Sequence, residues 1–358
     1  MDSADYNKEY FTSGLTAWHA TINNRCLPWK NEKDPYRIWL SEVILQQTRA
    51  QQGLPYYIRF TEAYPTINDL AAAGDNEVFR LWQGLGYYNR CKNMLATARY
   101  IAGELGGNFP RSYEGILGLK GIGPYTAAAI SSFAFGLPRA VVDGTVYRVL
   151  ARFFRSDIPF DTTGGKQYFA DLAAQLLDKN DSAGYNQAIM DLGATVCLPR
   201  KPRCTDCPLQ PRCSAYRHNV IDLLPVRSKR VVVGKRYFHY LILKWEESIW
   251  IQKRTARDIW ENLNEPFLIE SWEPMDVKAL SSNEQFLEQN FGYTHIELEY
   301  AGKQRLTHQI IEARFFRIYL NEKPLFSGSD GKWMTVTDLE NTPFPKTVLS
   351  FLKNNFYF

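Results

Sequence analysis

Four cysteines lie close together in this chain and form its clearest metal-binding pattern. Cys197, Cys204, Cys207 and Cys213 follow the spacing C-x6-C-x2-C-x5-C. Four thiolates this close in sequence can surround one soft metal centre. A zinc ribbon usually has two C-x-x-C pairs set well apart, whereas here one such pair is flanked by single cysteines. The spacing favours a [4Fe–4S] cluster over zinc. Disulfides are disfavoured because no secretory segment is evident and cytosolic disulfides are rare.

A glycine-containing turn precedes an apolar helical stretch in the middle of the chain. Residues 119–126 read Leu-Lys-Gly-Ile-Gly-Pro-Tyr-Thr. Gly121 and Gly123 let backbone N–H groups approach a phosphate, and the following helix N-terminus adds a positive dipole. Read alone, this segment indicates DNA-backbone binding or a plain turn between two helices.

Two carboxylic acids are candidates for a chemical role, although an N-cap explains Asp143 and an exposed helix face is the usual place for a glutamate such as Glu42. Asp143 stands at the expected start of a helix, where Asp is a favoured N-cap, and a capping Asp is also held rigidly. Glu42 has Ile38, Trp39, Leu45 and Gln46 as helical neighbours three or four residues away. These mostly apolar neighbours predict partial desolvation, which favours the neutral acid. A carboxylic acid that stays protonated near pH 7 can give a proton to a leaving base.

Composition and charge set the class of protein. The chain has 358 residues, enough for more than one domain. It lacks an apolar stretch of about 18 residues, so no membrane-spanning helix is expected. Residues 1–230 hold 27 basic and 21 acidic side chains, and residues 231–358 hold 15 and 17. The first part can meet a phosphate backbone, whereas the second is not a general binder of polyanions.

The periodicity predicts a helical first part and an α+β second part. A helix begins at Asp34-Pro35, a helix-start signal. We expect a linker over residues 218–236, which contains Leu223-Leu224-Pro225 and the basic residues after it. Further apolar periodicity predicts helices over 67–82, 92–105, 126–135, 145–154 and 166–178. Alternation predicts strands over 237–243, 248–253, 295–300 and 313–319, with a helix over 283–290.

Together these motifs resemble the MutY-type adenine DNA glycosylases of the endonuclease III, or helix–hairpin–helix, superfamily. The resemblance spans roughly residues 25–215 and is highly specific. It implies a multidomain protein with a mainly α glycosylase region at 1–217, including an iron–sulfur loop at 197–213. The matching stretches are Leu27-Pro28-Trp29, residues 39–48, residues 84–88, residues 119–126, residues 143–152, Asn186-Gln187-Ala188, Met190-Asp191-Leu192-Gly193 and the cysteine loop.

The resemblance assigns chemical roles to three residues. Glu42 corresponds to the acid that protonates adenine at N7, and Asp143 to the carboxylate that stabilises the developing sugar cation. Such a pair needs two different environments, because one acid must hold a proton while the other stays ionised. Tyr125 occupies the position where strand-cleaving relatives carry a nucleophilic lysine. A phenol cannot form a Schiff base, so base removal without a lyase step is expected.

Further DNA-binding roles follow position by position from the same resemblance. Gln46 and Tyr87 match residues that enter the base stack when adenine is flipped out. Gln187 matches a contact to the flipped adenine, and Trp29 lines the family's pocket. Thr145 departs from the family pattern, which commonly has Asn there, although Thr can still donate a hydrogen bond. The remaining residues assigned to DNA in this region are Gln47, Thr48, Gly121 and Gly123.

The second part resembles the MutY C-terminal domain, which is related to Nudix hydrolases. Leu306-Thr307-His308 stands where the family has Phe-Ser-His for reading 8-oxoguanine. Ile259-Trp260-Glu261 lies where relatives carry a Gly-Leu-Trp turn. The Glu-rich Nudix box is missing from the sequence, so an α+β Nudix-like recognition domain is expected at 237–358.

The sequence therefore predicts a base-excision repair enzyme that removes adenine paired with 8-oxoguanine or guanine in duplex DNA. The protein is expected to be an intracellular monomer that does not associate with membranes. If its source is bacterial, it is expected in the cytoplasm with the nucleoid. Two rival hypotheses stay open. One is an endonuclease III-like enzyme with lyase activity on oxidised pyrimidines, and the other is a non-enzymatic iron–sulfur DNA-binding protein.

Overall fold

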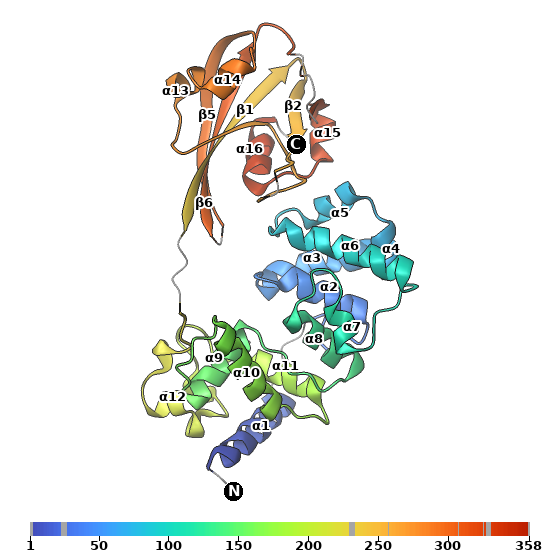
Figure 1. The fold of residues 1–358 in the computed structure, drawn as a ribbon, viewed down its shortest axis with the longest axis vertical. Helices are drawn as coiled ribbons and strands as arrows, with labels where there is room; N and C mark the ends of the chain where they lie inside the picture. The colour runs from blue at the N-terminus through green and yellow to red at the C-terminus, as the bar shows by residue number, and fades with distance from the viewer. Residues whose placement is uncertain are drawn as a thin grey trace. The chain divides into compact units, whose positions relative to one another are not determined.

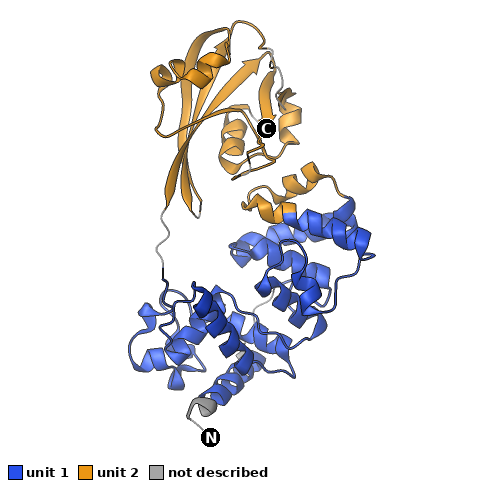
Figure 2. Ribbon diagram, viewed as in Figure 1, with its two compact units in different colours: residues 1–72, 93–230 blue, residues 73–92, 231–358 orange. Residues whose placement is uncertain are grey.

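The computed structural model describes residues 3–22, 27–228, 233–256, 258–306, 308–324, 326 and 331–356. The chain divides into two compact units (Figure 2). One contains residues 1–72 and 93–230, and the other contains residues 73–92 and 231–358. Within the described residues, no helix is both long and apolar enough to cross a bilayer.

The first unit is built from helices, as the periodicity predicts (Figure 1). One helix, α6 (Tyr88–Glu104), continues across the boundary between the two units. The other α-helices of this unit are α1 (Ser3–Ile22), α2 (Pro35–Leu45), α3 (Ala50–Ala63), α4 (Ile67–Ala72), α7 (Tyr113–Leu117), α8 (Pro124–Phe135), α9 (Gly144–Phe154), α10 (Thr163–Leu176), α11 (Ser182–Thr195) and α12 (Ser214–Arg217). Its 3-10 turns are η1 (Cys204–Asp206), η2 (Gln210–Arg212) and η3 (Ile221–Leu223).

One helix boundary differs from the expectation. The stretch 67–82 forms two helices, α4 and α5 (Asp75–Trp82), instead of one. Gly74 is the reason, because its extended backbone (φ −70°, ψ 140°) breaks the helical path and makes it the N-cap of α5. The helix predicted to start at Asp34-Pro35 is confirmed: the Asp34 carboxylate accepts a hydrogen bond from the Tyr36 backbone N–H.

The N-terminal helix α1 packs against helices from the other end of the same unit. Phe11, Leu15 and Trp18 are buried among apolar side chains of α9, α10 and α11. Phe11 makes an edge-to-face contact with Phe153, with the ring centroids 4.9 Å apart, a favourable arrangement for aromatic pairs. The helix thereby joins the first and last thirds of the unit around one core.

The second unit is a mixed sheet with helices, in agreement with the expected α+β class. Its strand order is β3-β2-β1-β6-β5, with β4 paired to β1 and β7 paired to β2. β1 and β6 run parallel, and β5 pairs antiparallel with β6. The strands are β1 (Gly234–Trp245), β2 (Ser248–Lys253), β3 (Asn264–Glu265), β4 (Phe267–Ser271), β5 (Tyr293–Arg305), β6 (Gln309–Leu320) and β7 (Gly331–Thr335). The helices besides α5 are α13 (Val277–Ser281), α14 (Glu284–Glu288), α15 (Val336–Glu340) and α16 (Lys346–Phe356).

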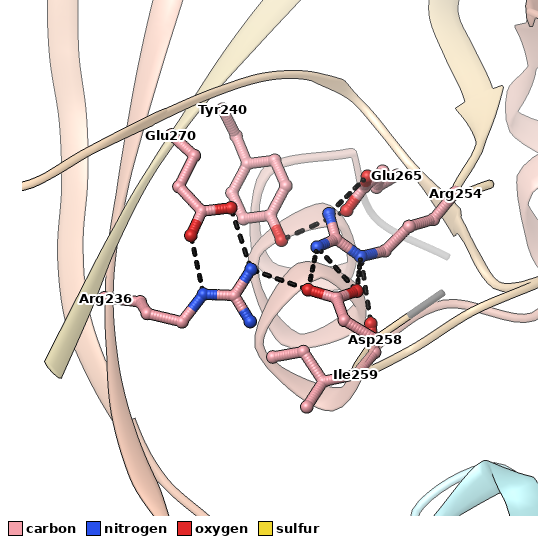
Figure 3. Close-up of polar contacts among 7 residues, drawn as sticks. All are labelled: Arg236, Tyr240, Arg254, Asp258, Ile259, Glu265 and Glu270. Carbon is pink, nitrogen blue, oxygen red and sulfur yellow. Dashed lines mark hydrogen bonds and ion pairs between the residues drawn. The ribbon is translucent and has the colours of Figure 1, made fainter. Parts of the chain in front are cut away.

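A chain of charged side chains fixes the loop between β2 and β3 (Figure 3). Arg236 donates to both carboxylate oxygens of Glu270, at 2.6 and 2.8 Å, and to Asp258 at 2.6 Å. Asp258 also accepts from Arg254, which donates to Glu265 at 3.1 Å. Arg254 and Glu265 are both buried. Loss of either buried partner would leave an uncompensated charge, so this network attaches Asp258 to Arg236 of β1 and to Arg254 at the end of β2.

Candidate active site

Glu42 lies on α2, a helix that buries most of its circumference. The Glu42 side chain is in the buried class, with 8% of the residue exposed, and Trp39 and Val43 beside it are also buried. Burial raises the pKa of Glu42 to about 7, because a charged carboxylate loses the solvation that water would provide. The expected desolvation of Glu42 among apolar neighbours is confirmed.

Tyr125 connects Glu42 to the helix that follows the glycine turn. It lies in the first turn of α8, and its hydroxyl is hydrogen-bonded to the Glu42 side chain. Burial and the two nearby carboxylates raise the pKa of Tyr125 well above its ordinary value, so the phenol stays neutral and donates this bond. The hydrogen bond from Tyr125 lowers the pKa of Glu42 and so opposes the effect of burial. The negative charge of Asp143 raises the pKa of Glu42, as burial does.

Asp143 sits at the start of α9 as the predicted N-cap. Its carboxylate accepts a hydrogen bond from the Val146 backbone N–H at 2.8 Å. Burial raises the pKa of Asp143, while hydrogen bonds from Val146 and Thr145 and the positive charge of Arg148 oppose that rise. Asp143 therefore receives several interactions that favour its charged form, which distinguishes it from Glu42.

Thr145 bonds to Asp143 through its side chain as well as its backbone. The hydroxyl thus supplies a hydrogen-bond donor at the position where the family commonly has Asn. The Thr145 methyl group packs against Gly193 of α11. A Cβ atom built at Gly193 would lie 2.1 Å from the Thr145 methyl carbon, so only glycine fits there without a shift.

One cavity of about 990 Å³ brings most of the predicted residues together. The two acids, Glu42 and Asp143, line it together with Tyr125. Among the lining residues that sequence reasoning did not assign are His19 and Met190: no helix was predicted around His19, and nothing in the local pattern distinguishes Met190 from a core residue. The other predicted residues that line the cavity are Trp29, Gln46, Gln47, Thr48, Thr145 and Gln187.

The rim of this cavity includes the turn that ends α2. Gln46 is the C-cap of α2, and its side-chain amide lies 3.5 Å from the Thr126 hydroxyl. Gln47 has a positive φ of 55°, an uncommon conformation for a residue with a side chain. Thr48 closes the turn through its backbone N–H to the Leu45 carbonyl. A tight turn of this kind presents the Gln47 side chain outward, where it is exposed.

The predicted hairpin forms between α7 and α8. Gly121 has a φ of 76°, and a Cβ atom there would lie 2.7 Å from the Asn93 Cβ, so glycine lets the turn pack against α6. Gly123 is the exposed N-cap of α8, and nothing lies within 4 Å of the position its Cβ would take. The start of this helix is therefore open to an anion, as helix N-termini commonly are.

The remaining predicted DNA contacts belong to the second unit. Tyr87 is 45% exposed and has a positive φ of 50°, in a turn that also contains Gly84 and Gly86 in positive-φ conformations. Leu306 directly follows β5, and the exposed His308 directly precedes β6. Thr307 lies outside the residues that the structure describes.

The four cysteines line a single small cavity in the first unit. Burial raises the pKa of Cys207 to about 12, and the other three sulfurs also raise it. Within the described ranges, no three His, Cys, Asp or Glu side chains are arranged around a single-ion position. Four thiols around a common space are nevertheless the donor set that an iron–sulfur cluster requires.

Two arginines connect the cysteine loop to the helix that carries Asp143. Arg148 of α9 donates to the Cys197 carbonyl at 2.7 Å and to the Gly193 carbonyl at 2.8 Å. Arg152, one turn further along, donates to the Leu198 carbonyl at 2.7 Å and lies 3.4 Å from the Cys197 sulfur. The loop is thus attached to α9 by charged side chains.

Comparisons with known proteins identify both halves of the chain. The model of the HhH-GPD superfamily of base excision DNA repair proteins matches residues 40–161, and that of the NUDIX domain matches residues 239–354. An adenine DNA glycosylase of Buchnera aphidicola (subsp. Baizongia pistaciae) is 34% identical over 258 residues, covering 71% of this chain and 72% of the relative. The chain belongs to the adenine DNA glycosylase family.

Other relatives agree with this membership. The mouse adenine DNA glycosylase is 42% identical over 216 residues, which cover 58% of this chain and 42% of the mouse protein. A thermostable thymine-DNA glycosylase matches in structure with a TM-score of 0.56 and 30% identity, over 61% of this chain and all of that one. An endonuclease III trapped on DNA matches with a TM-score of 0.51 at 21% identity, over 59% of this chain and 98% of that one, and supports the fold alone. The protein is a base-excision repair enzyme with a helical glycosylase fold and a Nudix-like domain.

Substitution of Glu42 by Gln should stabilise the protein at alkaline pH. The pKa of Glu42 is about 4.5 in the unfolded chain and is raised to about 7 in the folded protein. The folded protein therefore binds the Glu42 proton more tightly, and the wild-type protein loses stability as pH rises from about 4.5 through about 7. The loss is on the order of 3 kcal/mol. The glutamine side chain has no proton to lose, so the advantage of the variant should grow between pH 5.5 and pH 8.5. Urea unfolding at the two pH values measures it, with Glu62→Gln on the exposed face of α3 as control. An equal difference at both values would contradict the buried neutral acid.

Proposed function

We propose that this enzyme hydrolyses the N-glycosidic bond of adenine opposite 8-oxoguanine or guanine in duplex DNA. The observation that carries this proposal is the pair of acids in one cavity with different environments. A protonated acid and an ionised carboxylate are what the reaction needs, because adenine leaves poorly without a proton and the sugar develops positive charge. Residues 1–217 would carry out excision, residues 218–236 would link, and residues 237–358 would read the opposite base.

The two acids divide the reaction between them. Glu42 gives its proton to N7 of the flipped adenine as the C1′–N9 bond breaks and its electron pair leaves with the base. Asp143 stays ionised and stabilises the positive charge on the sugar. Water then adds to C1′ and loses its proton to a carboxylate, which leaves free adenine and an abasic site. Tyr125 holds Glu42 in place and offers no amine, so a strand-cleaving step is not part of this proposal.

The DNA contacts proposed around this chemistry follow the cavity and the hairpin. Gln46 and Tyr87 would enter the base stack in place of the flipped adenine, and Gln187 would contact the base in the cavity with Trp29. Gly121 and Gly123 would bring the hairpin backbone and the start of α8 to a phosphate. The remaining proposed DNA contacts are Gln47 and Thr48 on the cavity rim and Thr145 beside Asp143.

The cysteines fit the cofactor that this fold family usually carries. Cys197, Cys204, Cys207 and Cys213 would hold a [4Fe–4S] cluster, and when bound the cluster would tie the loop 197–213 into one rigid piece. Arg148 and Arg152 supply positive charge beside the thiolates. Both arginines belong to α9 and donate hydrogen bonds to the cysteine loop. An ordered loop would therefore support this helix, whose first residue follows Asp143.

Single-turnover excision on defined duplexes tests the proposed reaction. The expected order is adenine opposite 8-oxoguanine, then adenine opposite guanine, with thymine glycol left intact and no strand cleavage. Glu42→Gln and Asp143→Asn should bind the duplex and lose at least about 10²-fold in rate. Excision should fall as pH rises through about 7, where Glu42 loses its proton, and also at low pH, where Asp143 becomes neutral. A rate within tenfold of wild type for either variant would reject the assignment.

Metal analysis tests the cluster. Purified protein should contain about four irons per chain and be yellow-brown. Serine at any one of the four cysteines should lower the iron content and the yield of folded protein, whereas serine at the buried Cys91 serves as the control. One zinc and no iron per chain would reject the proposal.

Recognition of the opposite base is proposed for the turn between β5 and β6. His308 is exposed there, and Leu306 and Thr307 complete the segment that resembles the family's reading motif. 8-Oxoguanine differs from guanine by an oxygen at C8 and a proton at N7, and a polar contact to such a group gives about 1–3 kcal/mol of discrimination.

His308→Ala should therefore reduce the ratio of excision rates opposite 8-oxoguanine and guanine by about 5- to 100-fold. His295→Ala, an exposed substitution within β5, is the matched control. Both rates are compared at equal salt, because backbone affinity depends on salt. An unchanged ratio would place recognition elsewhere.

A further inference from the structure

A buried polar cluster lies between α8 and α11, outside the cavity. Ser132 of α8 and Ser182 and Asn186 of α11 are each 2% exposed or less. Asn186 donates to the Ser132 hydroxyl at 2.9 Å, and the Ser132 and Ser182 hydroxyl oxygens lie 3.4 Å apart. We call these three residues the α11 cluster. Burying a polar group costs free energy unless the group is hydrogen-bonded. The hydrogen bonds of this cluster therefore indicate which part of the chain it holds in place.

The α11 cluster holds the segment that leads from α8 to Asp143. That segment, residues 136–143, has no regular secondary structure. Ser182 donates to the Leu137 carbonyl at 3.0 Å, near the beginning of the segment. Asn186 donates to the Arg139 carbonyl at 2.8 Å and accepts from the Val141 N–H at 3.0 Å. Gly136 and Leu137, at the start of the segment, donate to backbone carbonyls of α8, whereas the carbonyls of Leu137 and Arg139 and the N–H of Val141 bond to side chains of α11.

Asn186 uses both ends of its amide on residues close to Asp143. The orientation of the amide is fixed, because a backbone N–H from Val141 can bond only to the amide oxygen, which leaves the NH2 group for Arg139 and Ser132. Val141 is buried, packs against Ala128 and Ala129 of α8, and precedes Asp143 by two residues. A shift of Val141 would therefore move the Asp143 carboxylate relative to Glu42 and Tyr125.

We propose that Asn186 is a positioning residue that sets the place of the Asp143 carboxylate in the cavity. This inference rests on the proposed function, in which Asp143 stabilises the sugar cation. The stabilisation depends on distance, and a displacement of about 1 Å can cost about 10²-fold in rate. Asn186 does not line the cavity, whereas its neighbour Gln187 does. One turn of α11 would thus supply both Gln187, which faces the flipped adenine, and Asn186, which holds the Asp143 carboxylate in place.

The experiment measures the rate of bond cleavage and DNA affinity separately. Asn186→Ala should lower the single-turnover excision rate about 10- to 100-fold. Its affinity for a duplex containing 2′-fluoro-deoxyadenosine, whose glycosidic bond resists cleavage, should stay within about threefold, because the DNA-binding residues are untouched. Asn186→Asp is a second variant of the same size. It keeps the acceptor for Val141 and loses both amide donors, so it should be intermediate in rate.

Ser182→Ala is the matched control. It removes a hydroxyl from the same buried cluster, at a bond to Leu137 instead of near Asp143. It should lower the melting temperature comparably while changing the excision rate less than about threefold. Equal rate losses for Asn186→Ala and Ser182→Ala at equal loss of melting temperature would overturn the inference, as would reduced DNA affinity with an unchanged rate. If Asn186→Ala does not fold, the same comparison is made with Asn186→Asp.

Asp143→Asn measured alongside separates this inference from the proposed function. If Asp143→Asn excises adenine at the wild-type rate, the role of Asp143 fails, and the positioning of its carboxylate has no catalytic meaning. If Asp143→Asn is inactive while both Asn186 variants keep the wild-type rate, the proposed function stands and only the role of Asn186 is rejected.

Discussion

Two carboxyl groups in one cavity cannot both be charged without repelling each other, and this constraint governs the first unit. Glu42 is buried on α2 with one hydrogen-bond donor, Tyr125, and its pKa is raised to about 7. Asp143 is surrounded by donors at the start of α9. Burial raises the pKa of both acids, and what distinguishes them is hydrogen bonding, because more donors oppose that rise at Asp143 than at Glu42.

The helices are arranged so that three different segments meet at these acids. α2 provides Glu42 from a nearly fully buried helix, α8 provides Tyr125 from its first turn, and α9 provides Asp143 at its N-cap. Each position is fixed by backbone geometry near a helix terminus or by dense packing. The cavity is therefore built on regular elements, which hold side chains more tightly than mobile loops do.

The sequence was informative where chemistry is local. The apolar neighbours of Glu42 at helical spacing predicted its burial, and the position of Asp143 before a helical stretch predicted its cap. The break at Gly74 was missed, although glycine is a recognised interruption of helices. Interactions between distant segments could not be predicted from local patterns. The packing of α1 on α9–α11 places His19 in the cavity, and only the folded structure shows that Asn186 bonds to Val141.

The contact between Thr145 and Gly193 has an evolutionary consequence. The methyl group of Thr145 occupies the space that any side chain at position 193 would need, while its hydroxyl serves Asp143. A side chain at position 193 would thus be accommodated most easily after the Thr145 methyl group had been lost, and it would still lie close to Val149, whose Cγ2 is 3.2 Å from that Cβ position. The reverse order carries no such steric barrier. The two positions should vary together in descendants of this sequence, and the order of the two changes would be constrained, with position 145 changing first.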